Sequence, residues 1–493
     1  MKRLQNERSF TVKKRSIYGD RSQEILRLYE EAGSSRRVLC VALDYAKKHH
    51  VVMFCDGEGD ILRKPFSVEN SPGGITTLTE HVKQWCDRRQ ISERQVFFGG
   101  EDAASYAENF VESLRSGGWL VAGVNAADAK KQRSTVQAST DRIDLMGIAR
   151  MLVNKRGNCS PAQVGVYRNL RTLVRHRRRL VMMTTGVRNR IHVIVDQLFP
   201  GFLDERKSGV SPFSQSSLWL MGRRFSASQI RRRKRSILVA GLRRWGSPHP
   251  ERVAAQIQDY AASVLHSSVE YVSTLQLSLA QHVKHLRCLQ ENVDQAEKEI
   301  AVWLAETQGA FLTSIRGIGI VLSAGVTAEI GDPTAQKPVS NLCSYGGIIP
   351  RVSQTGGPEG DSHTGSVGKR SNRILKDYVV QSGQHLGLHG PAELMADYQR
   401  RDANGQHAAF GMARRYMRMG MHLMKTSQVY LPARLRRKDS RPEERASYYL
   451  ATWPYLKNKW QKTDALLVAF APEHPLGQWR HMVQEVYGIK LTL

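Results

Sequence analysis

The sequence lacks the cysteine pairs that build zinc fingers and disulfide scaffolds. Its six cysteines are scattered, and none stands in a Cys-x-x-Cys pair, which fits a chain kept in a reducing cytoplasm. It also lacks an apolar run of about 18 residues, and its basic first segment has no apolar core. These absences argue against a transmembrane helix and a secretory signal. We therefore expect a cytoplasmic, nucleoid-associated protein with no membrane partner.

Acidic residues are scarce relative to basic ones. The 493 residues include 73 Lys and Arg but only 45 Asp and Glu, which gives a net charge of +28. This excess favours a polyanionic partner, because each neutralised phosphate releases counterions. The stretches 168–190 and 222–244 contain eight and nine basic residues and no acid. The predicted nucleic-acid contacts in these stretches are Arg168, Arg171, Arg175, Arg178, Arg179, Arg231, Arg232 and Arg233.

The first basic stretch carries apolar residues at roughly helical spacing. This pattern predicts an amphipathic helix with one packed face and one face for phosphates. A solvated arginine face or a localisation signal is the alternative. The absence of acids at i,i+4 positions favours contact with nucleic acid.

Short apolar runs separated by turn residues predict an α/β domain over residues 37–160. The expected order is β-β-β-α-β-α-β, which is typical of a ribonuclease-H-like (RuvC-like) domain. In such a sheet the first and fourth strands are neighbours. The expected strands are 38–43, 50–55, 61–68, 95–98 and 119–124.

The rest of the chain is predicted to be mainly helical. An apolar heptad pattern runs from Val272 to Trp303, with His282 as its one polar position. This pattern favours a coiled coil between chains, and hence a homodimer or homotetramer, over a long helix packed on its own domain. The remaining expected segments are a basic tail (1–36), an Arg-rich helical linker (161–250), the coiled coil (251–308), a mainly α C-terminal domain (309–430) and an extension (431–493).

Four carboxylates are placed to converge in this fold. Asp44 ends the first expected strand and Glu101 the fourth, while Asp141 and Asp144 stand at i and i+3 on one helix. Such a cluster repels itself unless a cation binds, and Mg²⁺ prefers oxygen ligands. Two such ions can activate the attacking oxygen and stabilise the leaving one in phosphoryl transfer. Each residue alone has an ordinary structural explanation, so the prediction depends on the strand order.

Two further features are candidates for contact with nucleic acid. The loop PRVSQTGG (350–357) contains hydroxyl side chains, and its basic neighbours could clamp a phosphate; these neighbours are Arg351, Lys369, Arg370 and Arg373. The Gly317-Ile318-Gly319 turn between two expected helices resembles a helix-hairpin-helix DNA contact. A tight packing turn explains the two glycines equally well.

With these residues placed, the sequence resembles the bridge-RNA-guided DEDD transposases of bacterial insertion sequences, relatives of the Piv/MooV DNA invertases. The resemblance runs from about residue 37 to residue 430, and it depends on the joint presence and order of several motifs. The matching segments are VALDYAKKHHVV, GGEDAASYAENF, VNAADAKKQR with STDRIDLMGIARML, the Arg-rich helix from residue 170 to 202, SIRGIGIVLSAGVTAEIGD, LCSYGGIIPRVSQTGG and GKRSNRILK.

The resemblance implies a RuvC-like domain, a coiled coil and a C-terminal transposase domain that act together. It implies a composite site in which the carboxylates of one subunit meet a serine of another. That serine would attack a DNA phosphate, form a covalent protein–DNA link and release a 3′-hydroxyl. A structured guide RNA would pair with target and donor DNA and so select the sites.

The hydroxyl loop departs from the family pattern. The family has Ser-Gly five residues after the proline of its GLxP motif, whereas here Thr355 and Gly356 follow Pro350 at that distance. Thr355 is therefore the first candidate nucleophile, Ser353 is the second, and loss of strand exchange is the third possibility. A hydrolytic RuvC-like nuclease and a non-catalytic nucleic-acid-binding protein derived from a transposase are the rival functions.

Overall fold

The computed structural model divides the chain into two compact units, residues 1–162 and 163–493. It describes residues 21–101, 106–133, 141–159, 165–222, 225–267, 269–334, 338–354, 362–367, 371–404, 407–437 and 439–493. Among these residues, no helix combines the length and the apolar character that crossing a membrane requires.

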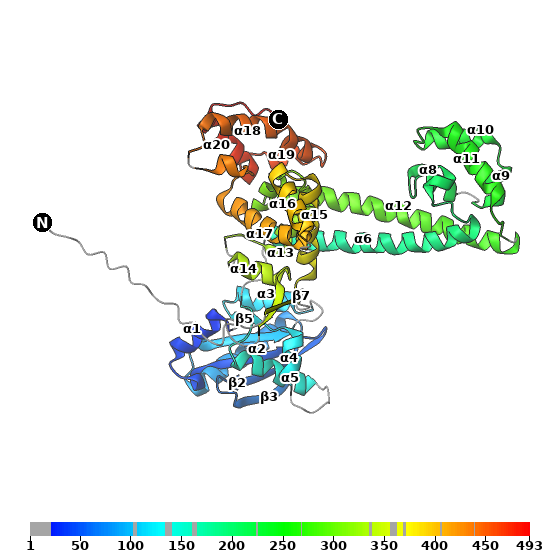
Figure 1. Ribbon diagram of the computed structural model, residues 1–493. Coiled ribbons are helices and arrows are strands. Elements are labelled where there is room, and N and C mark those ends of the chain that lie inside the picture. Colours follow the sequence, from blue (N-terminus) through cyan, green and yellow to red (C-terminus); the bar gives the residue numbers. More distant parts are fainter. Residues whose placement is uncertain are drawn as a thin grey trace. The chain divides into compact units, whose positions relative to one another are not determined.

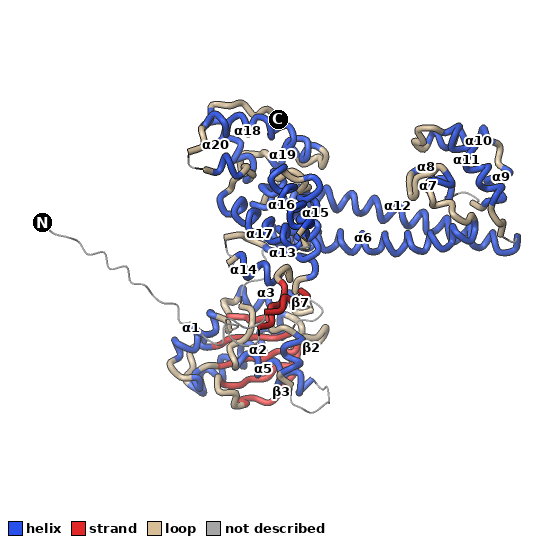
Figure 2. Tube along the Cα trace, viewed as in Figure 1, coloured by secondary structure: helices blue, strands red, loops and turns tan. Residues whose placement is uncertain are grey.

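The first unit is built on a five-stranded sheet with the order β3-β2-β1-β4-β5 (Figures 1 and 2). Its strands are β1 (Leu39–Asp44), β2 (His49–Asp56), β3 (Ile61–Glu69), β4 (Val96–Glu101) and β5 (Leu120–Gly123). The first three pair antiparallel, and β4 lies parallel to both β1 and β5. This confirms the predicted order of strands and helices along the chain and the predicted adjacency of the first and fourth strands.

Helices cover both faces of this sheet because successive strand residues point to opposite sides. Leu39, Val41 and Leu43 of β1 pack on one face with residues of α2 and α3, and Cys40 and Ala42 pack on the other with residues of α1 and α5. All five side chains are fully buried. The helices of this unit are α1 (Gln23–Ala32), α2 (Pro72–Arg89), α3 (Glu108–Ser116), α4 (Ala126–Lys131) and α5 (Asp141–Val153).

The short helix α1, which the apolar spacing within the basic segment predicts near residues 23–31, packs in this core. Ile25, Leu28 and Tyr29 are buried on its inner side, and the Tyr29 hydroxyl donates to the carbonyl of Gly57 at 3.3 Å. Ser22 caps the helix by accepting from the amide of Ile25. Only the spacing of three apolar residues distinguished this helix from the charged chain around it.

The second unit is organised around two long helices, α6 (Gly165–Leu198) and α12 (Val269–Ala305), which lie side by side (Figure 1). The start of α6 shares a hydrophobic core with the end of α12, and the end of α6 shares another with the middle of α12. The two helices are therefore antiparallel.

This arrangement changes the interpretation of the heptad pattern. Leu279, Leu286 and Leu289 of α12 are buried against Val187 and Ile191 of α6 in the same chain. The apolar face of α12 that was predicted to bind a second chain is thus covered by α6 of the same chain, which precedes it by about 100 residues. A seam formed with a second chain would have to displace α6.

A helical tip module, residues 199–267, connects the two long helices. Phe199, Phe202 and Phe225 are fully buried in its core, where Phe202 and Phe225 pack edge to face at 4.7 Å. The helices of this module are α7 (Glu205–Ser208), α8 (Gln215–Met221), α9 (Ala227–Arg232), α10 (Arg235–Arg244) and α11 (Pro250–Ser263).

The C-terminal helices form one core with the adjoining ends of α6 and α12. A 3₁₀ helix, residues 308–314, precedes α13, and a two-stranded hairpin of β6 (Pro350–Gln354) and β7 (Ser362–Val367) follows α14. Trp453 and Trp460 are buried in the same core, so the predicted C-terminal extension completes this domain. Its helices are α13 (Ile320–Ile330), α14 (Val339–Tyr345), α15 (Arg373–His389), α16 (Ala392–Ala403), α17 (Ala408–Thr426), α18 (Pro442–Gln461), α19 (Leu466–Ala469) and α20 (Pro475–Tyr487).

Candidate functional site

Two of the predicted carboxylates lie side by side at one edge of the sheet. Asp44 is the last residue of β1 and Glu101 the last residue of β4, and the two are direct partners in the parallel register. Both are partly exposed, although the strand residues before them are buried. Neighbouring parallel strands that end together place two negative charges close to each other, an arrangement that favours a bound cation.

The turn after Asp44 is held by a buried histidine. His50 of β2 is fully buried, its Nδ1 accepts from the amide of Ala46 at 3.2 Å, and its ring packs edge-on against Tyr45 and Phe110. These contacts fix the residues that follow the strand end. His50 therefore supports the position of Asp44.

Two glycines precede Glu101 and let its strand approach its neighbours. A Cβ atom on Gly99 would lie 2.4 Å from Leu152 Cδ2 of α5, and one on Gly100 would lie 2.4 Å from the carbonyl oxygen of Leu43. The first glycine allows α5 to pack closely on the sheet. The second allows β4 to pair with β1 in the register that brings Glu101 beside Asp44.

We expect Gly100→Ala to destabilise the protein by about 1–3 kcal/mol, because β4 must shift to relieve the overlap with β1. Gly123→Ala is the matched control, since Gly123 is the register partner of Gly100 on β5 and its added Cβ would meet nothing closer than 3.8 Å. Urea unfolding of both variants measures the difference. Equal stability would contradict this close approach of the two strands.

The other two carboxylates lie on α5, which packs against β1, β2 and β4. Asp144 forms an ion pair with Arg133 at 2.9 Å, with both side chains mostly buried. Asp141 begins the helix, and its side chain lies outside the described residues. Within the described part of the chain, no three His, Cys, Asp or Glu side chains are grouped to hold a metal. The four-carboxylate cluster therefore stays a prediction, of which Asp44 and Glu101 are the pair brought together.

The hydroxyl loop falls largely outside the described residues. Ser353 lies in β6 as the register partner of His363 in β7, and Thr355, which follows the strand, is not among the described residues. A hydrogen bond from α17 holds the chain just before the hairpin: the Arg414 guanidinium donates to the carbonyl of Ile348 at 3.0 Å. Both candidate nucleophiles therefore belong to the second unit, and the carboxylates belong to the first.

The basic residues predicted around this loop are placed only in part. Arg373 is exposed at the first position of α15. Arg351 lies in β6 with its side chain outside the described residues, and Lys369 and Arg370 lie outside them altogether. Their role as a phosphate clamp stays a prediction.

The Arg-rich helix α6 has acidic partners that its own sequence does not reveal. Arg175 binds Glu329 of α13 through two bonds of 2.8 and 2.9 Å, and Arg171 contacts the same carboxylate at 3.3 Å. Arg178 pairs with Asp377 of α15 at 2.5 Å. The basic stretch of α6 contains no acid, but acids from other helices lie next to it in the folded chain. Arg171, Arg175 and Arg178 therefore stabilise the domain from within.

Glu329 is the centre of this network. Its side chain is fully buried, and it also accepts from Nδ2 of Asn372 at 2.7 Å. Burial alone would raise its pKa, but the bonds from Arg175 and Asn372 and the charge of Arg171 outweigh burial and hold the pKa of Glu329 below its ordinary value. Asn372 caps α15 with its other side-chain atom. The network therefore joins α6, α13 and α15.

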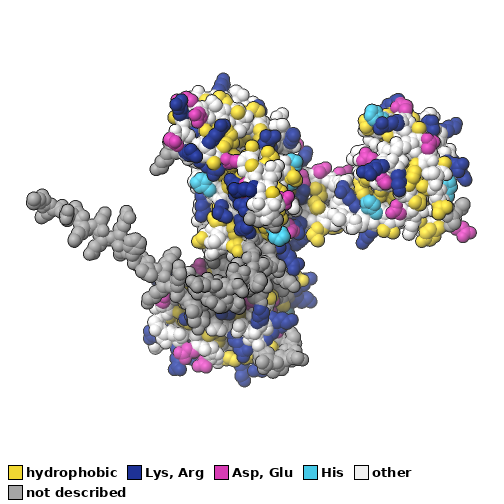
Figure 3. All heavy atoms as spheres, viewed as in Figure 1, with side chains coloured by type: hydrophobic (Ala, Val, Ile, Leu, Met, Phe, Trp, Pro, Cys, Tyr) yellow, Lys and Arg dark blue, Asp and Glu magenta, His cyan; other side chains and the backbone are white. Residues whose placement is uncertain are grey.

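Basic side chains are more accessible elsewhere in the second unit. Arg179 of α6 is exposed, as are Arg231 and Arg232 at the end of α9 in the tip module. The space-filling view shows Lys and Arg side chains gathered over the region of α16 and α17 as well (Figure 3). These exposed guanidinium groups match the predicted contact with a polyanion better than the paired arginines do.

The turn between the 3₁₀ helix and α13 contains two glycines, of which only the first is closely packed. Gly317 has a φ of +88°, and a Cβ there would lie 2.9 Å from the carbonyl oxygen of His385, so packing explains it. Gly319 caps α13 with a φ of −92°, and a Cβ there would meet no atom within 4 Å. The packing interpretation therefore accounts for Gly317 but not for Gly319.

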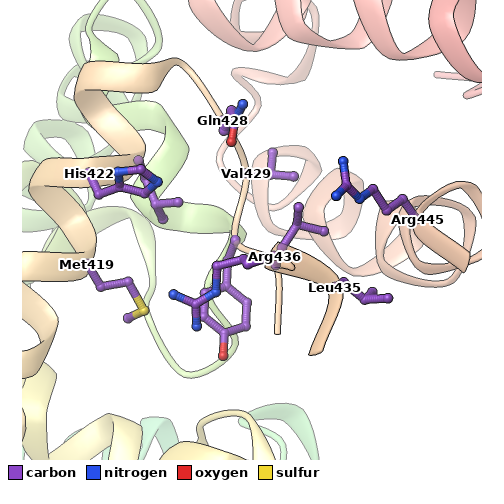
Figure 4. Close-up of a pocket in the computed structure, with 10 residues that line it drawn as sticks. Met419, His422, Gln428, Val429, Leu435, Arg436 and Arg445 are labelled. Atoms are coloured by element: carbon purple, nitrogen blue, oxygen red, sulfur yellow. The ribbon is translucent and has the colours of Figure 1, made fainter. Parts of the chain in front are cut away.

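A cavity of about 160 Å³ lies where α17 meets the segment before α18 (Figure 4). It is lined by Met419 and His422 of α17, by Arg436 of the segment before α18 and by Arg445 of α18. The Tyr430 hydroxyl, at its wall, donates to Glu393. The cavity is small and belongs to the packing of the C-terminal domain.

Sequence reasoning missed Arg133, Glu329 and Lys459. Glu329 had a visible signal, because it is the only charged residue of α13 and all its helical neighbours from Leu322 to Ile330 are buried. A lone acid in such a helix needs a buried partner. Arg133 had no comparable signal, since its partner depends on how α5 packs.

A family model described as a transposase matches residues 41–200, which include Asp44, Glu101 and the Arg-rich helix. The class of protein that fits the sheet, its paired carboxylates and the basic helix is therefore a transposase.

A second family model, described as the transposase IS116/IS110/IS902 family, matches residues 309–399. The two matched segments cover about half of the chain. The chain belongs to the IS110 family of insertion-sequence transposases.

Two curated relatives agree with this assignment. The insertion element IS110 uncharacterized 43.6 kDa protein of Streptomyces coelicolor is 27% identical over 231 residues, which are 46% of this chain and 55% of that protein. The insertion element IS116 uncharacterized 44.8 kDa protein of Streptomyces clavuligerus is 22% identical over 406 residues, which are 80% of this chain and 96% of that protein. The first match thus spans about half of its relative's length.

Proposed function

We propose that this protein is an RNA-guided DNA transposase that cuts and rejoins DNA through metal-bound carboxylates and a hydroxyl nucleophile. The observation that carries the proposal is the register pair of Asp44 and Glu101 at the ends of two adjacent parallel strands. Strand order, basic surface and family membership agree with it. The α/β domain is then a RuvC-like domain.

The carboxylates supply the oxygen donors that a divalent cation prefers, and two of the four already lie side by side. Asp44 and Glu101 supply oxygen ligands from the sheet, and Asp144 of α5 would join them after release from Arg133, with Asp141 one turn earlier on the same helix. When bound, Mg²⁺ ions would neutralise phosphate charge and favour formation of the attacking and leaving oxygens, and a two-metal site suits this ligand set. The chain's own part is to hold the carboxylates at the strand ends.

The hydroxyl nucleophile is proposed to be Thr355, with Ser353 as the alternative. The hydroxyl oxygen attacks the phosphorus, a protein–DNA ester forms, and the departing oxygen becomes a 3′-hydroxyl. The ester keeps the energy of the broken bond, so rejoining requires no high-energy cofactor. Because the β-methyl of threonine restricts χ1 and crowds the attack, we expect Thr355→Ser to react at least as fast as the unchanged chain.

The nucleic-acid partners are proposed to be DNA and a structured guide RNA. The exposed basic residues of α6 and of the tip module, Arg179, Arg231 and Arg232, support backbone contacts of the kind that read shape rather than sequence. Arg168 and Arg233 belong to the same two basic stretches.

A homodimer or homotetramer is proposed as the working form. The heptad face of α12 is occupied by α6, so the contact between chains would use other surfaces. The exposed Met182, Met183 and Val193 of α6 support such a contact, because large apolar side chains on a long helix favour association.

The decisive experiment looks for a covalent protein–DNA adduct. The full chain is incubated with Mg²⁺, DNA carrying the element's ends, and RNA transcribed from the DNA flanking its gene, and the products are resolved on a denaturing gel. We expect an adduct that disappears with EDTA, disappears in Thr355→Ala and persists in Ser353→Ala. The reverse pattern for the two variants would assign the attack to Ser353.

Two outcomes would favour the rival functions. Cleaved DNA with no adduct under any condition would indicate a hydrolytic nuclease that uses water. Binding of DNA or RNA without cleavage in Mg²⁺ or Mn²⁺ would indicate a non-catalytic binding protein derived from a transposase.

A further inference from the structure

A lysine from the C-terminal segment reaches into the turn that precedes α13. The Lys459 ammonium of α18 donates to the backbone carbonyl of Thr313, to that of Ile315 at 3.0 Å and to that of Ile318 at 2.6 Å. Three carbonyl oxygens from six consecutive residues thus converge on one nitrogen. The sequence alone indicates no role for the segment that supplies this lysine.

The convergence follows from the local chain path. The 3₁₀ helix ends at residue 314, where its last carbonyls lose their helical partners. The chain then turns back at Gly317, whose positive φ of +88° allows the reversal. Thr313, Ile315 and Ile318 are all fully buried, so water does not readily replace a missing partner. The Ile315 carbonyl also accepts from the amide of Ile318 at 3.1 Å, so the group that fills the turn has chiefly to satisfy the carbonyls of Thr313 and Ile318.

We propose that the turn of residues 313–318 is a binding site for a monovalent cation, built from the carbonyl oxygens of Thr313, Ile315 and Ile318, and that the Lys459 ammonium is its tethered occupant. The site belongs to the fold and is independent of the reaction that the protein catalyses.

The surroundings favour a cation rather than a neutral donor. No carboxylate of the described residues forms an ion pair with Lys459, so the carbonyl dipoles are its partners. Its ammonium also lies 4.3 Å from the centre of the Tyr455 ring, which attracts positive charge. Burial lowers the pKa of Lys459 to about 7. Only the protonated amine has three N–H groups, one for each of the three carbonyl oxygens.

Neutral oxygen ligands select for a single positive charge. Rings of backbone carbonyls replace the hydration shell of potassium in channels, whereas divalent cations in proteins bind mainly through carboxylates or retain water. The turn offers carbonyls only. Potassium, rubidium and ammonium ions are therefore the ligands that it would accept if the lysine were removed.

The tether also links the C-terminal segment to the glycine turn. The Tyr455 hydroxyl, one helical turn before Lys459 on α18, accepts from the amide of Gly317 at 3.2 Å. One helix thus satisfies both the carbonyls below the turn and an amide at its tip. This gives residues 442–461 a specific task in the domain.

The test removes the ammonium and offers a free ion in its place. Lys459→Met in the full chain keeps much of the side-chain volume, and we expect its melting temperature in choline chloride to fall by roughly 5–10 °C as the buried carbonyls lose their partner. Potassium chloride at the same ionic strength should restore about 3–6 °C. The unchanged chain should melt at the same temperature in both salts.

Lys457→Met is the matched control. Lys457 stands on the same helix but donates to a single carbonyl, that of Thr492, at 3.3 Å, so its loss should create no response to potassium. In crystals of Lys459→Met, rubidium should give an anomalous peak between the three oxygens.

Two results would overturn the proposal. A Lys459→Met chain that is no more stable, or no better folded, in potassium than in choline would show that the turn does not bind the ion. A Lys459→Gln chain as stable as the unchanged chain in choline would show that an uncharged donor suffices.

Discussion

Asp44→Asn is expected to reduce the proposed Mg²⁺-dependent strand exchange by roughly 10²–10³-fold, the usual effect of removing one group that stabilises transition-state charge. Asparagine keeps the shape of the side chain and removes only its charge. Because Asp44 and Glu101 are register partners, the substitution also relieves repulsion between like charges, so the melting temperature should stay level or rise. Strand-exchange rates and thermal unfolding of the same preparation measure both effects.

A substitution that lowers activity but not the melting temperature indicates a carboxylate that acts in the reaction rather than one that stabilises the fold. Asp87→Asn is a suitable control, since Asp87 is an exposed acid on α2 of the same unit and should change neither quantity. If Asp44→Asn retained full strand exchange, the assignment of Asp44 to the metal site would be wrong.

Glu329→Ala is expected to cost about 3–5 kcal/mol of unfolding free energy, because it leaves Arg175 and Arg171 without their buried partner. Glu297→Ala is the matched control. Glu297 of α12 pairs with Arg177, which lies on α6 like Arg171 and Arg175. The Glu297 side chain is 36% exposed, so its removal should cost at most about 1 kcal/mol. Denaturant titration of both variants gives the two values.

The same carboxylate should make the protein sensitive to acid. The pKa of Glu329 is lower in the folded chain than its ordinary value, so the folded state favours the ionised form. Its contribution to stability is therefore complete above about pH 4.5 and is lost as the pH falls through the folded pKa. The difference in stability between the unchanged chain and Glu329→Ala should shrink over that range. A difference independent of pH would contradict the ionised state of Glu329.

The α/β sheet could be predicted from sequence because its signals are local. Each strand is a short apolar run with a turn at its end, and the alternation of such runs with helices leaves few topologies. The position of Asp44 beside Glu101 followed from that topology alone. The arrangement of Asp144 did not, because its ion pair with Arg133 depends on how α5 and the segment after α4 pack.

Long-range packing explains the remaining differences. The heptads of α12 predicted a helix partner correctly, but a periodic pattern does not specify whether the partner is a second chain or an earlier helix. The basic run of α6 was interpreted from its neighbours in sequence, whereas Glu329 and Asp377 lie more than 150 residues away. The buried tryptophans of α18 show that the last segment belongs to the C-terminal core.

The tip module begins and ends at nearly the same place. Since α6 and α12 run antiparallel, residue 197 and residue 267 meet there, and the Ser267 hydroxyl donates to the carbonyl of Gln197. Because the two ends of this segment touch, a short reverse turn can replace it without moving the paired helices. Evolution could thus vary the basic surface of α9 while the paired helices α6 and α12 stay constant.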